Sequence, residues 1–212
     1  MDLEPLPRRF YERDSVQVAR DLIGRLLVRE VDGERLVGRI VEAEAYERHD
    51  PASHAYRGPT PRNRSMFGPP GHAYVYRSYG IHRCLNAVTK PVSAVLLRAL
   101  EPLEGLGSMA GRRGLSDPRL LCAGPGRLCQ ALAIDLDDDG LDLCTRQGLW
   151  LAGTGSASDV AVTRRVGITV AVDLPWRFVE ANSRYTSRSV AWGRLADSGA
   201  APSVDSARRR RG

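Results

Sequence analysis

Glu42, Glu44 and Tyr46 are spaced two residues apart in the segment RIVEAEAY, and they could carry acid–base chemistry. Side chains alternate between the two faces of a β-strand, so these three would share one face, while the valine and alanines between them would pack on the other. Burial beside an aromatic ring can adjust the pKa of a carboxylate, which suits a catalytic group. The alternative is a solvent-exposed strand face, although glutamate is not favoured in strands.

A second cluster lies in the stretch from Gly71 to Asn86, GHAYVYRSYGIHRCLN, which holds three tyrosines, two histidines and two arginines but no carboxylate. Tyr74 and Tyr76 would share a strand face, and Tyr79 would lie at or near the tip of a hairpin. Packing against the protein is the ordinary explanation for a strand tyrosine, but a tip tyrosine has little to pack against. Flat rings stack on bases and arginines bind phosphates, so with a nearby acid the cluster predicts a site that handles a nucleobase. A tip tyrosine could also wedge into a duplex.

The charge is unevenly distributed along the chain. The formal net charge is +6, but the terminal RRRR run contributes four of these charges, so the whole-chain value is weak evidence for nucleic acid. The stretch 51–100 has no Asp or Glu and carries seven cations, which would attract phosphates. Solvated arginines without a ligand would explain the same stretch. The cations are Arg57, Arg62, Arg64, Arg77, Arg83, Lys90 and Arg98.

Length and composition narrow the class of protein. The 212 residues can bury one core, and no apolar run reaches the roughly 20 residues of a membrane-spanning helix. The beginning MDLEPLPRRF does not read as a secretory signal. The four cysteines are scattered and the four histidines lie between positions 49 and 82, without metal-site spacing. We therefore expect a cytoplasmic protein with reduced thiols, no membrane segment, no metal and no cofactor.

The pattern of apolar and turn residues predicts the elements that must position these side chains. We expect a helix over 14–24, two strands over 25–31 and 36–46 around a DGE turn, and a long irregular region over 47–71. A hairpin over 73–88, a buried strand over 92–100 and a helix over 124–134 would follow. The segments LDLC, LWLA and RRVGITVAV are expected to be further strands or sheet edges. We expect one domain over 1–194 and a disordered basic tail over 195–212.

Several segments, in order, resemble the 3-methyladenine (alkyladenine) DNA glycosylase family. They are VEAEAY, DPASHAYRGPTPRNRSMFGPPGHAYVY, YGIHRCLN, LLRALEPLEG, GPGRLCQALAI, RRVGI and PWRF, between about Phe10 and Arg188. The resemblance implies a mixed α/β (α+β) fold in a single domain, with a curved, mainly antiparallel β-sheet, surrounding helices and a protruding β-hairpin that inserts into DNA. It also implies a monomeric, nucleoid-associated enzyme of bacterial type in base-excision repair, acting on double-stranded DNA that contains damaged purines.

The resemblance also assigns roles to residues of this sequence. Glu44 would be the catalytic residue that activates water, and Tyr79 would intercalate into the DNA. The base-binding residues would be Tyr46, His54, Tyr76, Asn86, Arg98 and Val166. The enzyme would flip an alkylated or deaminated purine, hydrolyse its N-glycosidic bond and leave an abasic site.

The sequence departs from the family pattern in the hairpin. Arg77 and Ser78 stand where relatives carry apolar residues, and Arg83 stands where they carry an aromatic. Two alternatives to the glycosylase are a non-catalytic nucleic-acid binding module and a nucleoside hydrolase.

Overall fold

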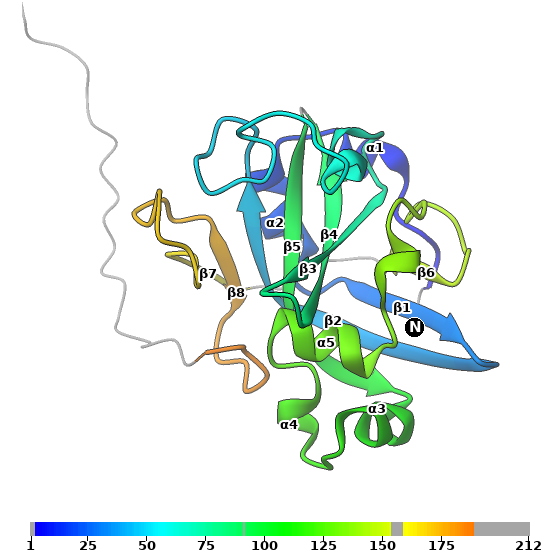
Figure 1. Cartoon of the computed structure of the whole chain (residues 1–212). Coiled ribbons are helices and arrows are strands. Elements are labelled where there is room, and N and C mark those ends of the chain that lie inside the picture. The colour runs from blue at the N-terminus through cyan, green and yellow to red at the C-terminus, as the bar shows by residue number, and fades with distance from the viewer. Residues whose placement is uncertain (1–2, 91, 154–158, 189–212) are drawn as a thin grey trace, which may run out of the picture.

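The computed structural model describes residues 3–90, 92–153 and 159–188 of the chain, and the structural statements below concern these residues (Figure 1). They form a mixed α/β fold around a curled, eight-stranded sheet in which the strand pairings are antiparallel. The strand order is β3-β4-β5-β2-β1-β6, and β8 joins the last part of β2 and pairs with β7. The strands are β1 (Leu26–Val31), β2 (Glu34–Tyr46), β3 (Ala73–Ser78), β4 (His82–Thr89), β5 (Ser93–Glu104), β6 (Leu149–Ala152), β7 (Val160–Thr163) and β8 (Arg177–Glu180).

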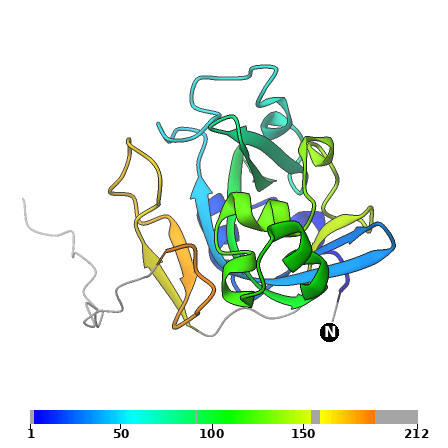
Figure 2. The same cartoon turned by 60° about the horizontal axis from the view of Figure 1, so that its bottom comes forward.

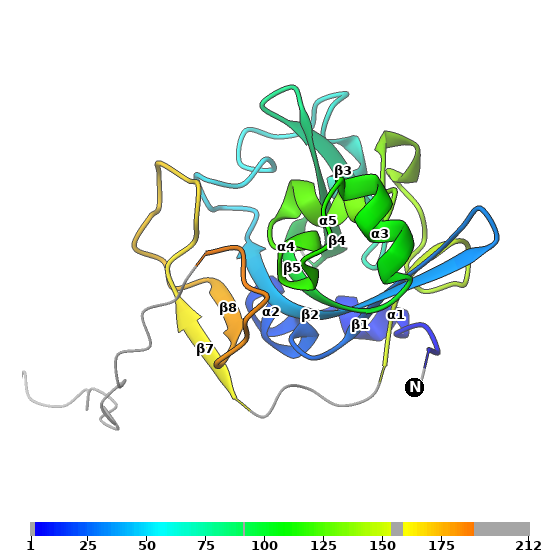
Figure 3. The ribbon, with the colours of Figure 1, turned by 90° about the horizontal axis from the view of Figure 1, so that it is seen from below.

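Short helices surround this sheet, as the sequence predicts. Figure 3 shows α2 and the group α3 to α5 on opposite sides of β2. The helices are α1 (Arg8–Tyr11), α2 (Ser15–Leu22), α3 (Leu106–Arg113), α4 (Pro118–Leu121), α5 (Pro125–Ala131) and the 3-10 turns η1 (Arg64–Phe67) and η2 (Leu136–Asp138). None of the helices in the described ranges is long and apolar enough to cross a membrane. The predicted fold class is confirmed, whereas the boundary at residue 194 stays a prediction and the expected tail lies outside the described residues.

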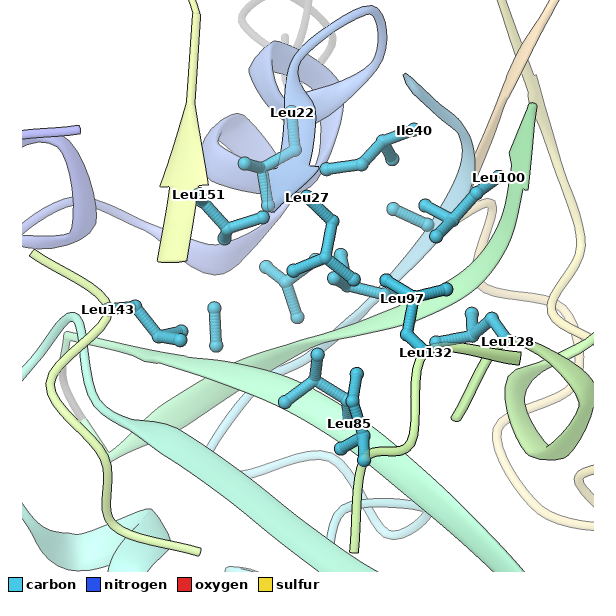
Figure 4. Close-up of a cluster of buried hydrophobic side chains, with 14 of the residues drawn as sticks. Leu22, Leu27, Ile40, Leu85, Leu97, Leu100, Leu128, Leu132, Leu143 and Leu151 are labelled. Atoms are coloured by element: carbon cyan, nitrogen blue, oxygen red, sulfur yellow. The ribbon is translucent and has the colours of Figure 1, made fainter. Parts of the chain in front are cut away.

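The helix α2 forms because its first turn is capped and one of its faces is apolar. The Asp14 side chain accepts hydrogen bonds from the amides of Val16 and Gln17 at 2.8 and 3.4 Å. The apolar face of α2 buries Val18 and Leu22 in the main core. Figure 4 shows how leucines from α2, α5 and the strands β1, β4, β5 and β6 converge there, in a core that ties the sheet to the helices on both sides.

A β-bulge in the middle of β2 decides which side chains face the core. Before the bulge, Leu36 and Ile40 belong to the core, whereas after it Ala43 and Ala45 do. The pairing with β5 slips between Ile40 and Glu42 and again after Glu42, so the alternation changes phase. The even-numbered residues after the bulge therefore lie on the face of the sheet that points away from the main core. Ala43 and Ala45 pack as predicted, and the two glutamates share the other face.

Two of the predicted strands are wrong. The segment LDLC (141–144) makes only an isolated bridge, because the Asp142 side chain pairs with Arg8 and accepts from the Cys144 amide, which turns the chain. The segment RRVGITVAV (164–172) is a loop between β7 and β8, because its Arg165 pairs with a buried carboxylate instead of extending a ladder. LWLA, by contrast, is the predicted strand β6.

Candidate active site

A cavity opens on the face of β2 to β5 that points away from the main core. Its volume of about 810 Å³ falls in the range of roughly 300–1,000 Å³ that is typical of ligand pockets. Its other walls come from the loop 47–71, the start of α5, and the segments 166–168 and 187–188. Figure 2 shows the loop after β2 (cyan) and the loop between β7 and β8 (yellow) at the same end of the sheet. The sequence-predicted residues that line the cavity are Tyr46, His54, Tyr76, Tyr79, Asn86, Arg98 and Val166.

Glu44 lies directly beneath this cavity and has no solvent exposure. Its Oε2 accepts from the Tyr46 hydroxyl at 2.9 Å and from Arg98 Nη1 at 3.1 Å, and its Oε1 accepts from the Val166 amide at 2.7 Å. These three donors all belong to residues of the cavity wall. The solvent-exposed strand face that the sequence left open is therefore wrong.

The electrostatics of Glu44 balance burial against these donors. Burial raises the pKa of Glu44, while Arg98, the Val166 amide and the Tyr46 hydroxyl lower it, and the net shift is upward. Burial and the nearby Glu44 charge raise the pKa of Tyr46, which therefore stays a hydroxyl that donates. The result is a carboxylate whose pKa lies above its usual range, a direction that suits a general base.

Three aromatic rings form one wall of the cavity. Tyr74 and Tyr76 stack with centroids 5.4 Å apart, and His54 meets Tyr76 edge-on at 4.5 Å. The Tyr74 hydroxyl lies 2.8 Å from His54 Nδ1, which fixes the histidine ring. Burial, and then the charge of Arg62, lower the pKa of His54, so its ring is neutral at pH 7. The wall therefore presents electron-rich faces without a charge of its own.

Tyr46 is held by an ion pair that sequence reasoning missed. The Arg165 guanidinium lies over the Tyr46 ring at 4.6 Å and over Trp176 at 5.2 Å, and it pairs with Asp50 where neither side chain is exposed. Arg165 also donates to the Ala45 carbonyl at 3.0 Å. It therefore anchors the loop that places the next residue's amide on Glu44. The buried arginine in RRVGI and the acid that opens DPASHAY carried no signal of their pairing, because they are 115 positions apart.

Asn86 has a fixed side chain on the cavity floor. Its amide nitrogen donates to the carbonyls of Tyr74 and Cys84 at 2.9 and 3.4 Å, and the residue is only 4% exposed. Within the described ranges its Oδ1 makes no hydrogen bond. The cavity therefore contains an oriented carbonyl oxygen that can accept a hydrogen bond from the edge of a bound ring.

The hairpin of β3 and β4 projects beside the cavity, and Tyr79 lies at its tip. The Tyr79 side chain is 87% exposed, and its backbone has a φ of +50°, a conformation that tight turns impose. The strands below the tip are firmly held, since Asp139 accepts from the Val75 amide at 2.9 Å and Asp135 accepts two bonds from Arg83. Arg83, one of the departures noted above, is thus paired within the protein.

The rim of the cavity is positive. Arg62, Arg127 and Arg188 line it, and none of them pairs with a carboxylate of the described residues. The part of the chain that the structure describes contains no group of three or more His, Cys, Asp or Glu side chains that could hold a metal ion. The ring-lined cavity, its positive rim and the buried carboxylate beneath it suit a flat heterocycle joined to phosphates.

Comparison with known proteins identifies the family. The chain matches the family of methylpurine-DNA glycosylase (MPG) over residues 9–184 and belongs to it. A protein of Carboxydothermus hydrogenoformans is 50% identical over 188 residues, which cover 86% of this chain and 98% of that protein. A protein of Methanoculleus marisnigri is 53% identical over 192 residues, with coverage of 86% and 98%, and one of Granulibacter bethesdensis is 54% identical over 190 residues, with coverage of 87% and 88%. All three carry the name "Putative 3-methyladenine DNA glycosylase". The sequence prediction of this family, and of a DNA glycosylase of base-excision repair, is confirmed.

The raised pKa of Glu44 predicts how its charge affects stability. A carboxyl whose pKa is higher in the folded state stabilises the fold most below its unfolded pKa, and that contribution is lost as the pH rises through the folded pKa. Glu44→Gln should therefore become more stable relative to the wild type as the pH rises from about 4 to 7. Urea unfolding of both proteins at several pH values measures this difference. A difference that falls over that window would contradict the raised pKa.

Proposed function

We propose that this protein is a monofunctional DNA glycosylase that flips a damaged purine into the cavity and hydrolyses its N-glycosidic bond, with Glu44 as the catalytic base. The observation that carries the proposal is the position of Glu44, buried beneath a ring-walled cavity and held by three donors from the cavity wall. Its substrate would be double-stranded DNA, which a monomer would meet in the cytoplasm.

The first step is capture of the base. An extruded purine would stack between the rings of Tyr46, Tyr76 and His54. A purine nucleotide alkylated at N3 or N7 carries a positive charge on its base, and a cation against electron-rich rings gains about 2 kcal/mol when it is desolvated. Asn86 Oδ1 and the backbone of Val166 would contact the edge of the base. Damaged pairs also cost less to open, which favours lesions over normal bases.

The second step is cleavage and attack by water. The bond between C1′ and the base nitrogen breaks, its electron pair leaves with the base, and the sugar acquires oxocarbenium character that a carboxylate stabilises. Glu44 Oε2 already accepts two hydrogen bonds, whereas Oε1 accepts only that of the Val166 amide. A carboxylate oxygen accepts about two, so Oε1 is free to take the proton of a water molecule. That water bonds to C1′ and leaves an abasic site.

Glu44→Gln tests this role. The glutamine keeps the shape of the site but cannot accept the proton, so the rate of base release in a single turnover should fall by roughly 10²–10⁴-fold. Binding to the same methylated duplex should stay close to that of the wild type. The measurement is single-turnover release of free purine from an oligonucleotide with excess enzyme. Release by this variant at the wild-type rate would remove Glu44 from the reaction, and DNA binding without base release by the wild type would favour a binding module.

The reaction should end at the abasic site. A lyase step commonly needs a lysine amine, and Lys90, the one lysine of the chain, is beyond the cavity wall and pairs with Glu12 at 3.5 Å. Borohydride added during turnover should therefore trap no protein–DNA adduct, which a denaturing gel can show. A trapped adduct that disappears in Lys90→Ala would contradict monofunctional chemistry.

Tyr79 is proposed to fill the gap that the extruded base leaves. Removing its ring in Tyr79→Ala should weaken binding to an abasic-site duplex on the order of ten-fold, since ring–base stacking is worth roughly 1–3 kcal/mol. Tyr56→Ala is the matched control, because Tyr56 is also exposed, at 54%, but does not line the cavity. Fluorescence anisotropy measures both. Equal affinities for the two variants would mean that the tip does not enter the duplex.

A further inference from the structure

Glu42 is a second buried carboxylate on the face of β2 that carries Glu44, and the proposed reaction leaves it without a role. It has no solvent exposure. Its Oε1 accepts from Arg98 Nε at 3.1 Å, Arg177 Nε at 2.7 Å and Ser187 Oγ at 2.8 Å, and its Oε2 accepts from the Ser187 amide at 2.6 Å. A buried charge is costly unless its partners are held in place, so this arrangement fixes several elements relative to one another.

One consequence concerns the orientation of Arg98. A guanidinium is a rigid plane, so anchoring its Nε determines where its Nη groups point. With Nε on Glu42, Nη1 lies 3.1 Å from Glu44 Oε2 and 3.3 Å from the Val166 carbonyl. Without that anchor the same guanidinium could turn toward Glu44 in other ways and would no longer join the carboxylate to the loop of Val166.

A second consequence concerns the wall of the cavity. Ser187 and Arg188 line it although they follow the sheet strand β8 by several residues. Two hydrogen bonds from Ser187 to Glu42 hold this segment, and Arg177 Nη2 lies 3.5 Å from the Arg188 carbonyl. Arg188 is exposed, so the buried carboxylate places a positive charge where the phosphates of an extruded nucleotide would pass.

We propose that Glu42 is a positioning residue of the glycosylase, which orients Arg98 toward Glu44 and holds Ser187 and Arg188 at the cavity wall. The proposal rests on the proposed function of Glu44. It separates two effects that can be measured apart: the chemical rate through Arg98, and DNA binding through Arg188.

The experiment for the first effect is a double-mutant cycle on the single-turnover rate of base release at saturating enzyme. Glu42→Gln should lower this rate at least about ten-fold, because small misplacements of catalytic groups have large effects. Arg98→Lys keeps the positive charge but loses the planar fork. If Glu42 acts through that fork, adding Glu42→Gln to Arg98→Lys should lower the rate less than about two-fold further, because coupled effects are not additive.

The second effect is measured by binding and by hydrogen exchange. Glu42→Gln should weaken binding to the methylated duplex and speed deuterium exchange in the peptide that contains Ser187, because the single oxygen of glutamine cannot accept from both the arginines and the Ser187 amide. Ser187→Ala keeps the hydrogen bond from the backbone amide of residue 187 to Glu42, so it should change DNA binding and deuterium exchange less. Asp138→Asn is the matched control, since Asp138 is a buried carboxylate paired with Arg29 at 2.7 Å and lies outside the cavity. It should lower stability without changing either readout.

The outcomes distinguish this inference from the function on which it rests. Wild-type protein that releases no base overturns both. If Glu44→Gln is inactive while Glu42→Gln, corrected for its folded fraction, matches the wild type in rate and exchange, only the role of Glu42 is overturned. Equal losses in the wild-type and Arg98→Lys backgrounds would also overturn it, because Glu42 would then act independently of Arg98.

Discussion

The site depends on one guanidinium shared by two buried carboxylates. Arg98 binds Glu42 through Nε and Glu44 through Nη1, and both glutamates are fully buried. Such charges remain in a protein interior only where the geometry compensates their loss of hydration. Arg177, Ser187 and the amide of Val166 complete that compensation. The constraint therefore joins β2, β5, β8 and two loops that are distant in sequence.

The bulge in β2 makes this arrangement compatible with a packed core. Without the change of phase between Ile40 and Ala43, the side chains that follow would continue the earlier alternation, and the glutamates would point at the leucines of the core. With it, one strand supplies Leu36 and Ile40 to the core, Tyr46 to the cavity wall, and Glu44 beneath that wall. The bulge thus lets one strand supply side chains to the core and to the cavity side of the sheet.

Much of this could be predicted from the sequence, for physical reasons that also explain the misses. The period of two placed Glu44 with Tyr46, and the tight turn placed Tyr79 at a tip, because both are local properties of the chain. The bulge left no local signal. The loop of Arg165 was mistaken for a strand because its apolar residues alternate, while its partner Asp50 is distant in sequence. The roles of the site residues, and the entry of the hairpin into DNA, stay predictions.

The firm support of the hairpin has a further consequence. Asp139 and Asp135 fix β3 and β4 from one side, and a Cβ at Gly126 of α5 would meet the His82 side chain at 2.9 Å, so the helix packs closely against the strand. These contacts favour one conformation of the hairpin. If its tip enters DNA as proposed, the elastic strain falls on the nucleic acid, and flexible pyrimidine–purine steps around a lesion would lower that strain. The enzyme would then favour some sequence contexts without contacting their bases.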